Sequence, residues 1–420
     1  MKIIKDIKPE DYQAILKRPF EADNSVAEIV KDIISEVKLN GDKALINITK
    51  RIDKKVVKSI EVSKDEMISQ SALVSQELKE AIAVAIANIE KFHKAQLPDD
   101  VDIETLQGVR CMLKYRPLER VGLYIPGGTA PLISTLLMLA VPTKVAGCKE
   151  LIACSPPEPS PEILYACNLL RVRLFRIGGA QAIAAMAYGT ETIPKVDKLF
   201  GPGNRYVTEA KIQASSMGVP IDMPAGPSEV LIIADDNSNS IYVAADLLSQ
   251  AEHGVDSQVI LVATSQRIID QILMEVEKQL NQLPRKEIAS ACLENSVAIL
   301  VDNIEKAIEI SNYYAPEHLI LSLSNSEKYI SQIENAGSVF LGEYSPESAG
   351  DYSSGTNHTL PTGESAKNWS GVTALSFMKT ITFQKLSKNG LESIAKSIVT
   401  LARAEGLEAH ARAAELRLIN

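Results

Sequence analysis

Short β-rich runs that alternate with Ala- and Leu-rich helical patterns constrain the fold of this chain most strongly. This alternation is typical of parallel β/α units, in which helices cover a parallel sheet. Four runs precede the Pro- and Gly-rich segment DMPAGPSE (222–229), and five follow it. The nine runs are VGLYIP (121–126), ELIACSP (150–156), RLFRIG (173–178), KLFGPG (198–203), VLIIAD (230–235), QVILVAT (258–264), VAILVD (297–302), LILSLS (319–324) and SVFLGE (338–343). The pattern predicts an α/β protein with two incomplete Rossmann-like parallel-sheet units.

Helical patterns flank these units at both ends. Val26 to Val37 and Gln76 to Lys94 carry apolar residues at three-and-four spacing, and residues 391–420 read as two amphipathic helices parted at Glu405 and Gly406. We therefore expect N-terminal helices and a helical C-terminal tail. A chain of 420 residues also exceeds one ordinary core. The expected parts are an N-terminal arm (1–22), a helical segment with the second α/β unit (23–115 plus 229–375), the first α/β unit (116–228) and the C-terminal tail (376–420).

The composition fits a globular protein that acts on small molecules. A formal charge of −9 and a pI near 5.3 disfavour binding to nucleic acid or to an anionic membrane. The longest apolar stretch, residues 132–146, is interrupted by polar residues and proline, so we expect no membrane span. The five cysteines include no C-x-x-C pair, which fits buried thiols in a reducing cytoplasm rather than disulfides or a thiolate zinc site.

Four of the five histidines lie in polar segments of the C-terminal half. They are His253 in SQAEHG (249–254), His318 in APEHL (315–319), His358 in GDYSSGTNH (350–358) and His410 in EGLEAH (405–410). Imidazole is the commonest protein metal ligand and titrates nearest neutral pH. Scarce histidines next to Asp, Glu and Gln therefore predict one polar site with a metal and an acid/base pair.

One candidate ligand set combines Gln250, His253, Asp351 and His410. Gln250 and His253 are three residues apart on the last turn of a predicted helix (240–254), so they project from the same side. Asp351 follows Gly350 in a predicted loop, and His410 lies on the C-terminal tail. Two nitrogen and two oxygen donors without sulfur suit zinc, and manganese or cobalt would also fit. His253 interacting with the helix dipole and Asp351 as an ordinary loop residue are the alternatives.

Glu317 and His318 are a candidate acid/base pair. They stand between a predicted helix (304–314) and a predicted strand, directly after Pro316. Adjacent side chains in regular structure point apart, so the pair serves one site only if this junction is irregular. The alternative is a surface Glu next to a half-buried His without catalytic function.

Three Gly-rich turns follow strands of the first unit. They are YIPGGTAP (124–131), IGGAQA (177–182) and FGPGN (200–204). Ligands bind at the carboxyl ends of parallel strands, so a nucleotide site is expected here. None of the turns is a G-x-G-x-x-G fingerprint, and tight turns that need positive φ explain each glycine equally well.

Taken together and in order, eight segments resemble the histidinol dehydrogenase family. They are VGLYIPGGTAPL, GGAQAIAA, KLFGPGNRYVTEAK, IDMPAGPSEVLIIAD, LLSQAEHG, APEHL, ESAGDYSSGTNHTLPT and EGLEAHARA. The resemblance runs from about Arg116 to the C-terminus. It implies a zinc- and NAD-dependent alcohol and aldehyde dehydrogenase of the last steps of histidine biosynthesis. Such an enzyme oxidises L-histidinol to L-histidine via histidinal, with two NAD and one water.

The resemblance also implies roles for individual residues. Gln250, His253, Asp351 and His410 would bind one zinc per subunit and contact the substrate. Further implied substrate contacts are Ser228, His318, His358 and Glu405, and the implied NAD contacts are Tyr124, Gln181 and Asn204. NAD is thereby expected on the first unit, and the metal and catalysis on the second. The family further implies an intertwined homodimer in which His410 reaches the partner's site.

The expected chemistry divides between two side chains. His318 takes the alcohol proton as hydride leaves, and Glu317 activates the water that hydrates the aldehyde. Two rival functions come from other classes. An aldehyde dehydrogenase would need a nucleophilic cysteine, yet none of the five adjoins these segments. A non-catalytic, zinc-stabilised binding protein would need a closed metal site.

Overall fold

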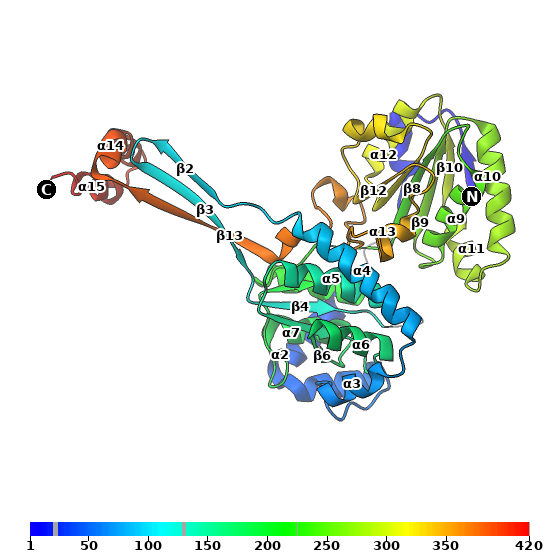
Figure 1. Ribbon diagram of the computed structural model, residues 1–420, viewed down its shortest axis with the longest axis horizontal. Coiled ribbons are helices and arrows are strands. Elements are labelled where there is room, and N and C mark those ends of the chain that lie inside the picture. Colours follow the sequence, from blue (N-terminus) through cyan, green and yellow to red (C-terminus); the bar gives the residue numbers. More distant parts are fainter. Residues whose placement is uncertain (20–23, 128–131, 225, 420) are drawn as a thin grey trace.

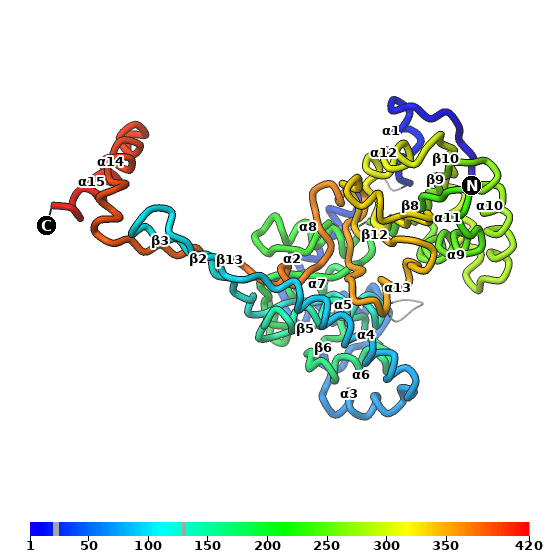
Figure 2. The backbone as a smooth tube through the Cα atoms, turned by 45° about the horizontal axis from the view of Figure 1, so that its top comes forward, coloured from blue at the N-terminus to red at the C-terminus, as the bar shows by residue number. Residues whose placement is uncertain are grey.

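The protein consists of two α/β units and a long arm that carries the C-terminus (Figure 1). The computed structural model describes residues 1–19, 24–127, 132–224 and 226–419. Both views show the arm projecting away from the two units (Figures 1 and 2). Across these described ranges, no helix is both long and apolar enough to cross a membrane.

The first unit is built on a four-stranded parallel sheet in the order β6-β5-β4-β7. Its strands are β4 (Arg120–Tyr124), β5 (Glu150–Cys154), β6 (Arg173–Phe175) and β7 (Lys198–Phe200). The helices that alternate with them are α5 (Ile133–Val145), α6 (Pro161–Leu170), α7 (Gly179–Tyr188) and α8 (Arg205–Ser216). The strand order reverses between β4 and β7, as in Rossmann-like sheets.

Three N-terminal helices also pack on this first sheet. Helix α2 (Asn24–Ile52) contacts α7 and α8, α3 (Lys64–Ser71) contacts α6, and α4 (Gln76–Lys94) contacts α5. Their apolar residues join the core clusters that contain strands β4 to β6. This differs from the grouping of residues 23–115 with the second unit, because an amphipathic stripe shows that a helix covers a core but not which one.

The second unit has a six-stranded parallel sheet in the order β1-β10-β9-β8-β11-β12. Its strands are β1 (Lys2–Ile4), β8 (Glu229–Ala234), β9 (Gln258–Ala263), β10 (Val297–Leu300), β11 (His318–Ser322) and β12 (Ser338–Leu341). Its helices are α1 (Tyr12–Ile15), α9 (Ser240–Ala251), α10 (Gln266–Leu280), α11 (Lys286–Glu294), α12 (Ile304–Tyr314) and α13 (Glu347–Tyr352). Short 3-10 turns in this unit are η1 (Pro9–Asp11), η2 (Ser326–Gln332) and η3 (Ser365–Lys367), whereas η4 (Ala374–Phe377) packs on α5 of the first unit.

Burial explains why the strand runs of this unit are nearly all apolar. Every residue of β8 and β9 is buried, because helices cover both faces of the sheet. The segment 1–22, expected as a separate arm, supplies the edge strand β1 beside β10. All nine predicted β-runs contain a strand, so the prediction of two parallel-sheet units is confirmed.

The arm combines an antiparallel sheet with the two C-terminal helices. Strands β2 (Val101–Leu106), β3 (Val109–Pro117) and β13 (Met378–Leu386) pair in the order β13-β3-β2. Helices α14 (Lys388–Ala404) and α15 (Glu408–Glu415) follow, which confirms the helical tail and its break near Glu405. The strand β13 within residues 376–420 was not expected. Its residues are largely exposed on both faces, so it lacks the apolar alternation that marks a half-buried strand.

Candidate active site

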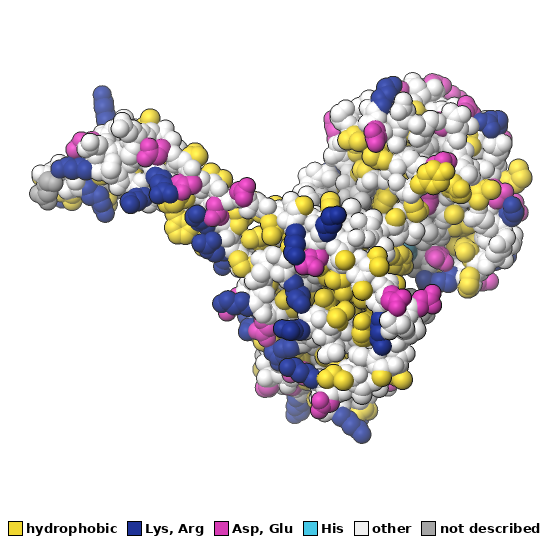
Figure 3. Space-filling view, in the orientation of Figure 1, with side chains coloured by type: hydrophobic (Ala, Val, Ile, Leu, Met, Phe, Trp, Pro, Cys, Tyr) yellow, Lys and Arg dark blue, Asp and Glu magenta, His cyan; other side chains and the backbone are white. Residues whose placement is uncertain are grey.

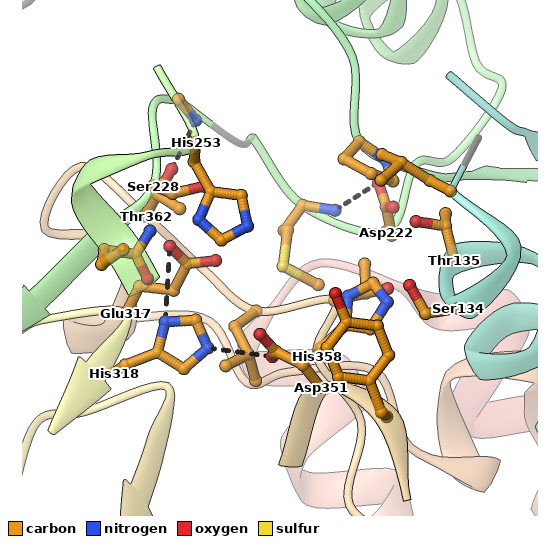
Figure 4. Close-up of a pocket in the computed structure, with 18 residues that line it drawn as sticks. Ser134, Thr135, Asp222, Ser228, His253, Glu317, His318, Asp351, His358 and Thr362 are labelled. Carbon is orange, nitrogen blue, oxygen red and sulfur yellow. Dashed lines mark hydrogen bonds and ion pairs between the residues drawn. The ribbon is translucent and has the colours of Figure 1, made fainter. Parts of the chain in front are cut away.

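A pocket of about 170 Å³ lies between the two α/β units. The first unit lines it with residues that follow strands β4 and β7, such as Ser134, Thr135 and Pro202. The second unit lines it with residues at the amino ends of β8 and β11 and with the end of α9 and α13 (Figure 4). Seven predicted site residues line this one pocket: Ser228, Gln250, His253, Glu317, His318, Asp351 and His358.

Helix α9 delivers Gln250 to the pocket floor. The helix begins after Asn239, whose side chain accepts a hydrogen bond from the amide of Ile241, and its apolar face packs on the sheet. Gln250 is fully buried. Both carboxyl oxygens of Glu347 face one end of the Gln250 amide, so we assign the amide nitrogen to that end, where it donates to Glu347 with one N–O distance of 3.1 Å. The amide oxygen therefore points to the opposite side and is available to a ligand.

His253 follows one turn later, just beyond the end of α9. Its backbone N–H donates to the carbonyl of Gln250 over 3.2 Å, which keeps the two residues together. His253 is exposed to solvent in a single chain. Loss of water around the ring nevertheless lowers the pKa of His253, so its imidazole is neutral and suited to bind a metal.

Asp351 lies on helix α13, so the prediction that it lies in a loop is wrong. The helix fits there because a Cβ on Gly350 would lie only 2.7 Å from the Phe340 ring, and glycine lets α13 pack closely on β12. The same helix begins with Glu347, a buried carboxyl that the sequence analysis missed. Because Glu347 and Asp351 are four residues apart, both face the pocket side of α13. That spacing was the available sequence signal.

The junction before β11 is irregular, as a shared role for Glu317 and His318 requires. Helix α12 ends at Ala315 in the left-handed conformation (φ 52°), and Pro316 follows. Both side chains line the pocket, and Glu317 Oε2 lies 3.7 Å from His318 Nδ1 (Figure 4). The backbone of Glu229 contacts both: its N–H donates to Glu317 over 2.9 Å, and its carbonyl lies 3.3 Å from His318 Nδ1.

Burial and charge shift the pKa of this pair strongly. Burial raises the pKa of Glu317 to about 8. Burial alone would lower the pKa of His318, but the carboxyls of Glu347, Glu317 and Asp351 outweigh it and raise this pKa to about 10. Burial also raises the pKa of Glu347 to about 8. For Asp351, burial would raise the pKa, but the His318 ring at 3.7 Å, together with His358 and His253, outweighs burial and lowers it. Such opposed shifts within one pocket are typical of acid/base sites.

Two buried ring nitrogens in the pocket lack a hydrogen-bond partner among the described residues. The Nε2 atoms of His318 and His358 are buried and form no hydrogen bond with the described residues. Burial lowers the pKa of His358, so its ring is neutral. Unpaired buried nitrogen atoms are costly unless a ligand or water binds them. The pocket therefore fits a ligand with several polar atoms.

The metal-ligand set is incomplete within one chain. Among the described residues, no three His, Cys, Asp or Glu side chains come together closely enough to hold a metal. Gln250, His253 and Asp351 share the pocket, whereas His410 lies on α15 at the end of the arm. Glu405, the predicted substrate contact, ends helix α14 on the same arm. Both residues are exposed and do not line the pocket of their own chain.

The predicted NAD residues gather at the carboxyl edge of the first sheet. Tyr124 ends β4, and its hydroxyl accepts a hydrogen bond from the Gly179 amide over 3.0 Å. Burial raises the pKa of Tyr124 to about 12, so it stays protonated. Gln181 is buried on α7 with Nε2 unpaired, and Asn204 caps helix α8 with its side-chain oxygen. The end of the turn YIPGGTAP, residues 128–131, lies outside the described residues.

The loop between β7 and α8 is held against β4. Gly201 has φ 122°, and a Cβ there would collide with the carbonyl oxygen of Tyr124. Glycine is therefore required for this close approach, in addition to the positive φ. A second pocket of about 350 Å³ lies along this carboxyl edge and is lined by residues such as Gly127, Ser155 and Pro156.

The cysteines take no part in the pocket. Cys154, Cys167 and Cys292 are buried, Cys111 and Cys148 are partly buried, and none of the five lines the space between the units. Burial raises the pKa of Cys148 to about 12 and that of Cys292 to about 11. A thiol with a raised pKa is a poor nucleophile. The site therefore offers carboxylates and imidazoles but no reactive thiol.

Comparison with known proteins gives a consistent result. Residues 16–418 match the protein family described as Histidinol dehydrogenase. Histidinol dehydrogenase of Mannheimia succiniciproducens is 50% identical over 420 residues, which cover 99% of this chain and 98% of that protein. The one of Bacteroides thetaiotaomicron is 50% identical over 423 residues, 100% of this chain and 99% of that protein. The crystal structure of histidinol dehydrogenase from Elizabethkingia anophelis has a TM-score of 0.97 and 53% identity, covering 100% of this chain and 98% of that chain.

Proposed function

The chain belongs to the histidinol dehydrogenase family, and we propose that the pocket between its two units oxidises L-histidinol to L-histidine with NAD. The strongest support is the arrangement of Glu317 and His318, which line one pocket together with a set of metal-type ligands. The pKa values of both side chains are shifted upwards. The reaction removes two hydrides in turn, from the alcohol and from the hydrated aldehyde. Histidinal is the intermediate, and the pathway is histidine biosynthesis.

We propose that Gln250, His253 and Asp351 hold a zinc ion together with His410 from a second chain. The donors fit, because Gln250 turns its oxygen away from Glu347, His253 is neutral and Asp351 is ionised. Bound there, zinc would hold the imidazole and amino nitrogens of the substrate and would neutralise the charge that Asp351 presents to His318. Glu347 orients Gln250 from behind, as outer-shell carboxylates do in many metal sites.

His318 is proposed as the base of the first oxidation. Three surrounding carboxyls raise its pKa to about 10. His318 would lose its proton more easily when Asp351 binds zinc, because one of these carboxyl charges is then neutralised. The neutral ring takes the alcohol proton as hydride leaves for NAD. Its Nε2 is the free atom for this transfer, since the opposite nitrogen, Nδ1, lies against the Glu229 carbonyl.

Glu317 is proposed to serve the second oxidation. The aldehyde must first add water, and a carboxylate next to that water removes its proton. Burial raises the pKa of Glu317 to about 8, which brings it close to the working pH of a general base. The Glu229 N–H holds one carboxylate oxygen and leaves the other for the water. Ser228, His358 and Glu405 are proposed to contact the substrate, the last from the partner's arm.

NAD is proposed to bind along the carboxyl edge of the first sheet, at Tyr124, Gln181 and Asn204. This edge faces the pocket, because Pro202, which lies between Gly201 and Asn204 in the sequence, lines the pocket. The nicotinamide can then reach the substrate from the first unit while zinc is held by the second. Ligands commonly bind at this edge of Rossmann-like sheets.

The arm is proposed to pair with a second copy in an intertwined homodimer. Its exposed apolar side chains include Ile103, Phe383 and Leu401, the last with 62% of its surface exposed. The space-filling view shows such side chains along the arm (Figure 3). Exposed apolar surface of this kind marks an interface. The five free cysteines fit a reducing compartment, and we propose a cytoplasmic enzyme without a nucleic-acid or membrane partner.

The test is NADH formation from histidinol by the purified protein, measured at 340 nm with and without a chelator. We expect two NADH per histidinol, and loss of turnover with the chelator. Treatment with iodoacetamide should leave the rate unchanged, since no thiol lines the pocket. Thiol-sensitive turnover would favour the aldehyde dehydrogenase type of chemistry. Absence of any NADH would instead leave a zinc-stabilised binding protein.

A further inference from the structure

Arg18, in the N-terminal segment, binds a buried carboxylate next to the catalytic pair. Its Nε lies 2.5 Å and its Nη2 2.9 Å from the two carboxylate oxygens of Glu229, a bidentate ion pair. The side chains are 14% and 3% exposed, so the pair is shielded from water. The guanidinium also stacks on Tyr314 at 4.0 Å from the ring centroid. Arg18 is not among the residues that line the pocket, and it lies outside the segments that carry the family resemblance.

The same guanidinium joins three segments of the second unit. Nη2 donates to the carbonyl of Tyr314 at the end of α12, over 2.8 Å. Glu229 begins β8, and its Oε1 also accepts from the Gly363 amide over 2.9 Å. Each segment continues within a few residues into the pocket, to Glu317, Ser228 and Thr362 respectively. Arg18 thus fixes the relative positions of three walls of the site.

Glu229 transmits this constraint through its main chain. Its N–H donates to Glu317 Oε2 over 2.9 Å, and its carbonyl lies 3.3 Å from His318 Nδ1. Both catalytic side chains are therefore aligned by one peptide segment, and the side chain of that residue is held by Arg18. Main-chain contacts of this kind set orientation to within fractions of an ångström, which strongly affects rates.

We propose that Arg18 is a positioning residue for the Glu317 and His318 pair, acting through Glu229. The proposal rests on the proposed dehydrogenase function of the pocket. Arg18 contacts neither the metal-type ligands nor the pocket itself. Its loss should therefore lower kcat for histidinol and for histidinal while leaving KM for both substrates and for NAD nearly unchanged.

The experiment compares Arg18→Gln and Arg18→Lys with two control variants of the same N-terminal segment. Tyr12→Phe removes the hydrogen bond of Tyr12 to Glu309, and Leu16→Ala removes a buried apolar side chain. Within the part of the chain that the structure describes, no hydrogen bond or ion pair joins either control residue to Glu229. All variants are assayed as the full-length, zinc-loaded protein, with melting temperature and zinc content measured in parallel. His318→Ala serves as the reference for a lost catalytic group.

We expect Arg18→Gln to lower kcat by about 10- to 100-fold with KM changed less than about twofold. Arg18→Lys, which keeps the charge but not the two-pronged geometry, should fall between it and the wild type. The controls should keep kcat within about twofold even at an equal loss of melting temperature. Unchanged kcat in Arg18→Gln, or an equal loss in a control of matched stability, overturns the proposal.

A double-mutant comparison covers the case in which Arg18→Gln folds poorly. Glu229→Gln keeps the shape of the side chain and weakens the same ion pair. The double variant with Arg18→Lys should therefore lose less kcat than the product of the two single losses. Fully multiplicative effects would mean that the two residues act independently, and the proposal fails. A wild-type protein that does not oxidise histidinol would refute the proposed function itself, whereas normal wild-type activity with unaffected Arg18 variants refutes only the positioning role.

Discussion

The pocket and the arm differ most in how deeply their side chains are buried. In the pocket, Gln250, Glu347 and His318 are 0%, 1% and 4% exposed, and each has a polar neighbour within the same chain. On the arm, Ile103 and Phe383 are 53% and 42% exposed, and His410 lies at the surface. The pocket side chains are buried within their own chain, whereas these arm side chains are exposed in a single chain. The proposed acid/base pair thus lies in the pocket, whereas His410, the proposed fourth metal ligand, lies on the arm.

Physical reasons account for this division. A buried carboxyl and imidazole need an accurate, rigid environment, which the amino edge of a fully covered parallel sheet supplies. A three-stranded antiparallel sheet with exposed faces is only marginally stable on its own. Pairing the arm with another subunit would bury its apolar side chains and at the same time bring His410 to a site. Assembly and catalysis would then depend on each other.

Removal of the metal should have the largest effect on activity and the smallest on the fold. We expect a chelator to abolish turnover, because it would remove the zinc that is proposed to hold the substrate at Gln250, His253 and Asp351. The far-UV circular-dichroism signal should persist, since both sheets have apolar cores of their own. Dialysis against zinc should restore the rate. Unfolding at the chelator concentration that stops turnover would instead indicate a structural metal and erase the contrast between pocket and arm.

Substitution of His318 tests whether the pocket, as opposed to the arm, supplies the base that takes the alcohol proton. His318→Ala or His318→Asn should lower the rate of histidinol oxidation by about 10² to 10⁴. Binding should weaken far less, because the proposed metal ligands are intact. Pre-steady-state NADH formation and a separate measurement of histidinol affinity distinguish the two. A variant that loses affinity and rate in equal proportion would show that His318 mainly holds the substrate.

The two regions also differ in how well the sequence predicted them. The sequence predicted the β-runs of the parallel sheets, because buried strands are continuous apolar stretches. It also predicted four residues that line the pocket, because they flank these runs: Gln250, His253, Glu317 and His318. Glu347 was missed because its role depends on the amide of Gln250, which is about a hundred residues away. The arm strands were missed because their residues are largely exposed on both faces, so burial leaves no period-two pattern.

Tertiary pairing explains the remaining failures. Asp351 was expected in a loop because Gly350 and the following Ser and Gly residues disfavour a helix, yet close packing on Phe340 stabilises α13. Helices α2 to α4 carry a clear amphipathic pattern, but that pattern does not show which of the two sheets they cover. The choice depends on how the helices pack in the folded chain. The role of Arg18 left no sequence signal, because the ion pair joins residues 211 positions apart.

Glu317→Gln should separate the two oxidations. The amide still accepts the hydrogen bond from the Glu229 N–H, so the pocket geometry is preserved. It no longer takes a proton from water, and we expect aldehyde oxidation to fall by about 10²-fold while alcohol oxidation falls less. Single-turnover assays that start from histidinol and from histidinal give the two rates. Identical losses in both assays, matching those of His318→Ala, would contradict the division of labour within the pocket.

The last prediction asks whether the arm completes the partner's pocket. A mixture of His410→Ala and His318→Ala subunits, under conditions that allow exchange, should regain activity although each parent is impaired. A heterodimer has one doubly damaged site, and its other site combines an intact pocket with an intact arm. Half of the dimers in a statistical mixture are heterodimers, so recovery should approach about a quarter of wild-type activity.

Mass spectrometry must confirm that heterodimers formed, and a mixture of His318→Ala with Glu317→Gln subunits is the matched control. Both control substitutions lie in the pocket, so every dimer site in that mixture carries one of them, and activity should not exceed the average of the parents. Recovery in the first mixture and not in the control assigns His410 to the neighbouring site. Absence of recovery despite confirmed heterodimers would mean that His410 acts within its own chain or binds no metal, and the arm would then serve assembly alone.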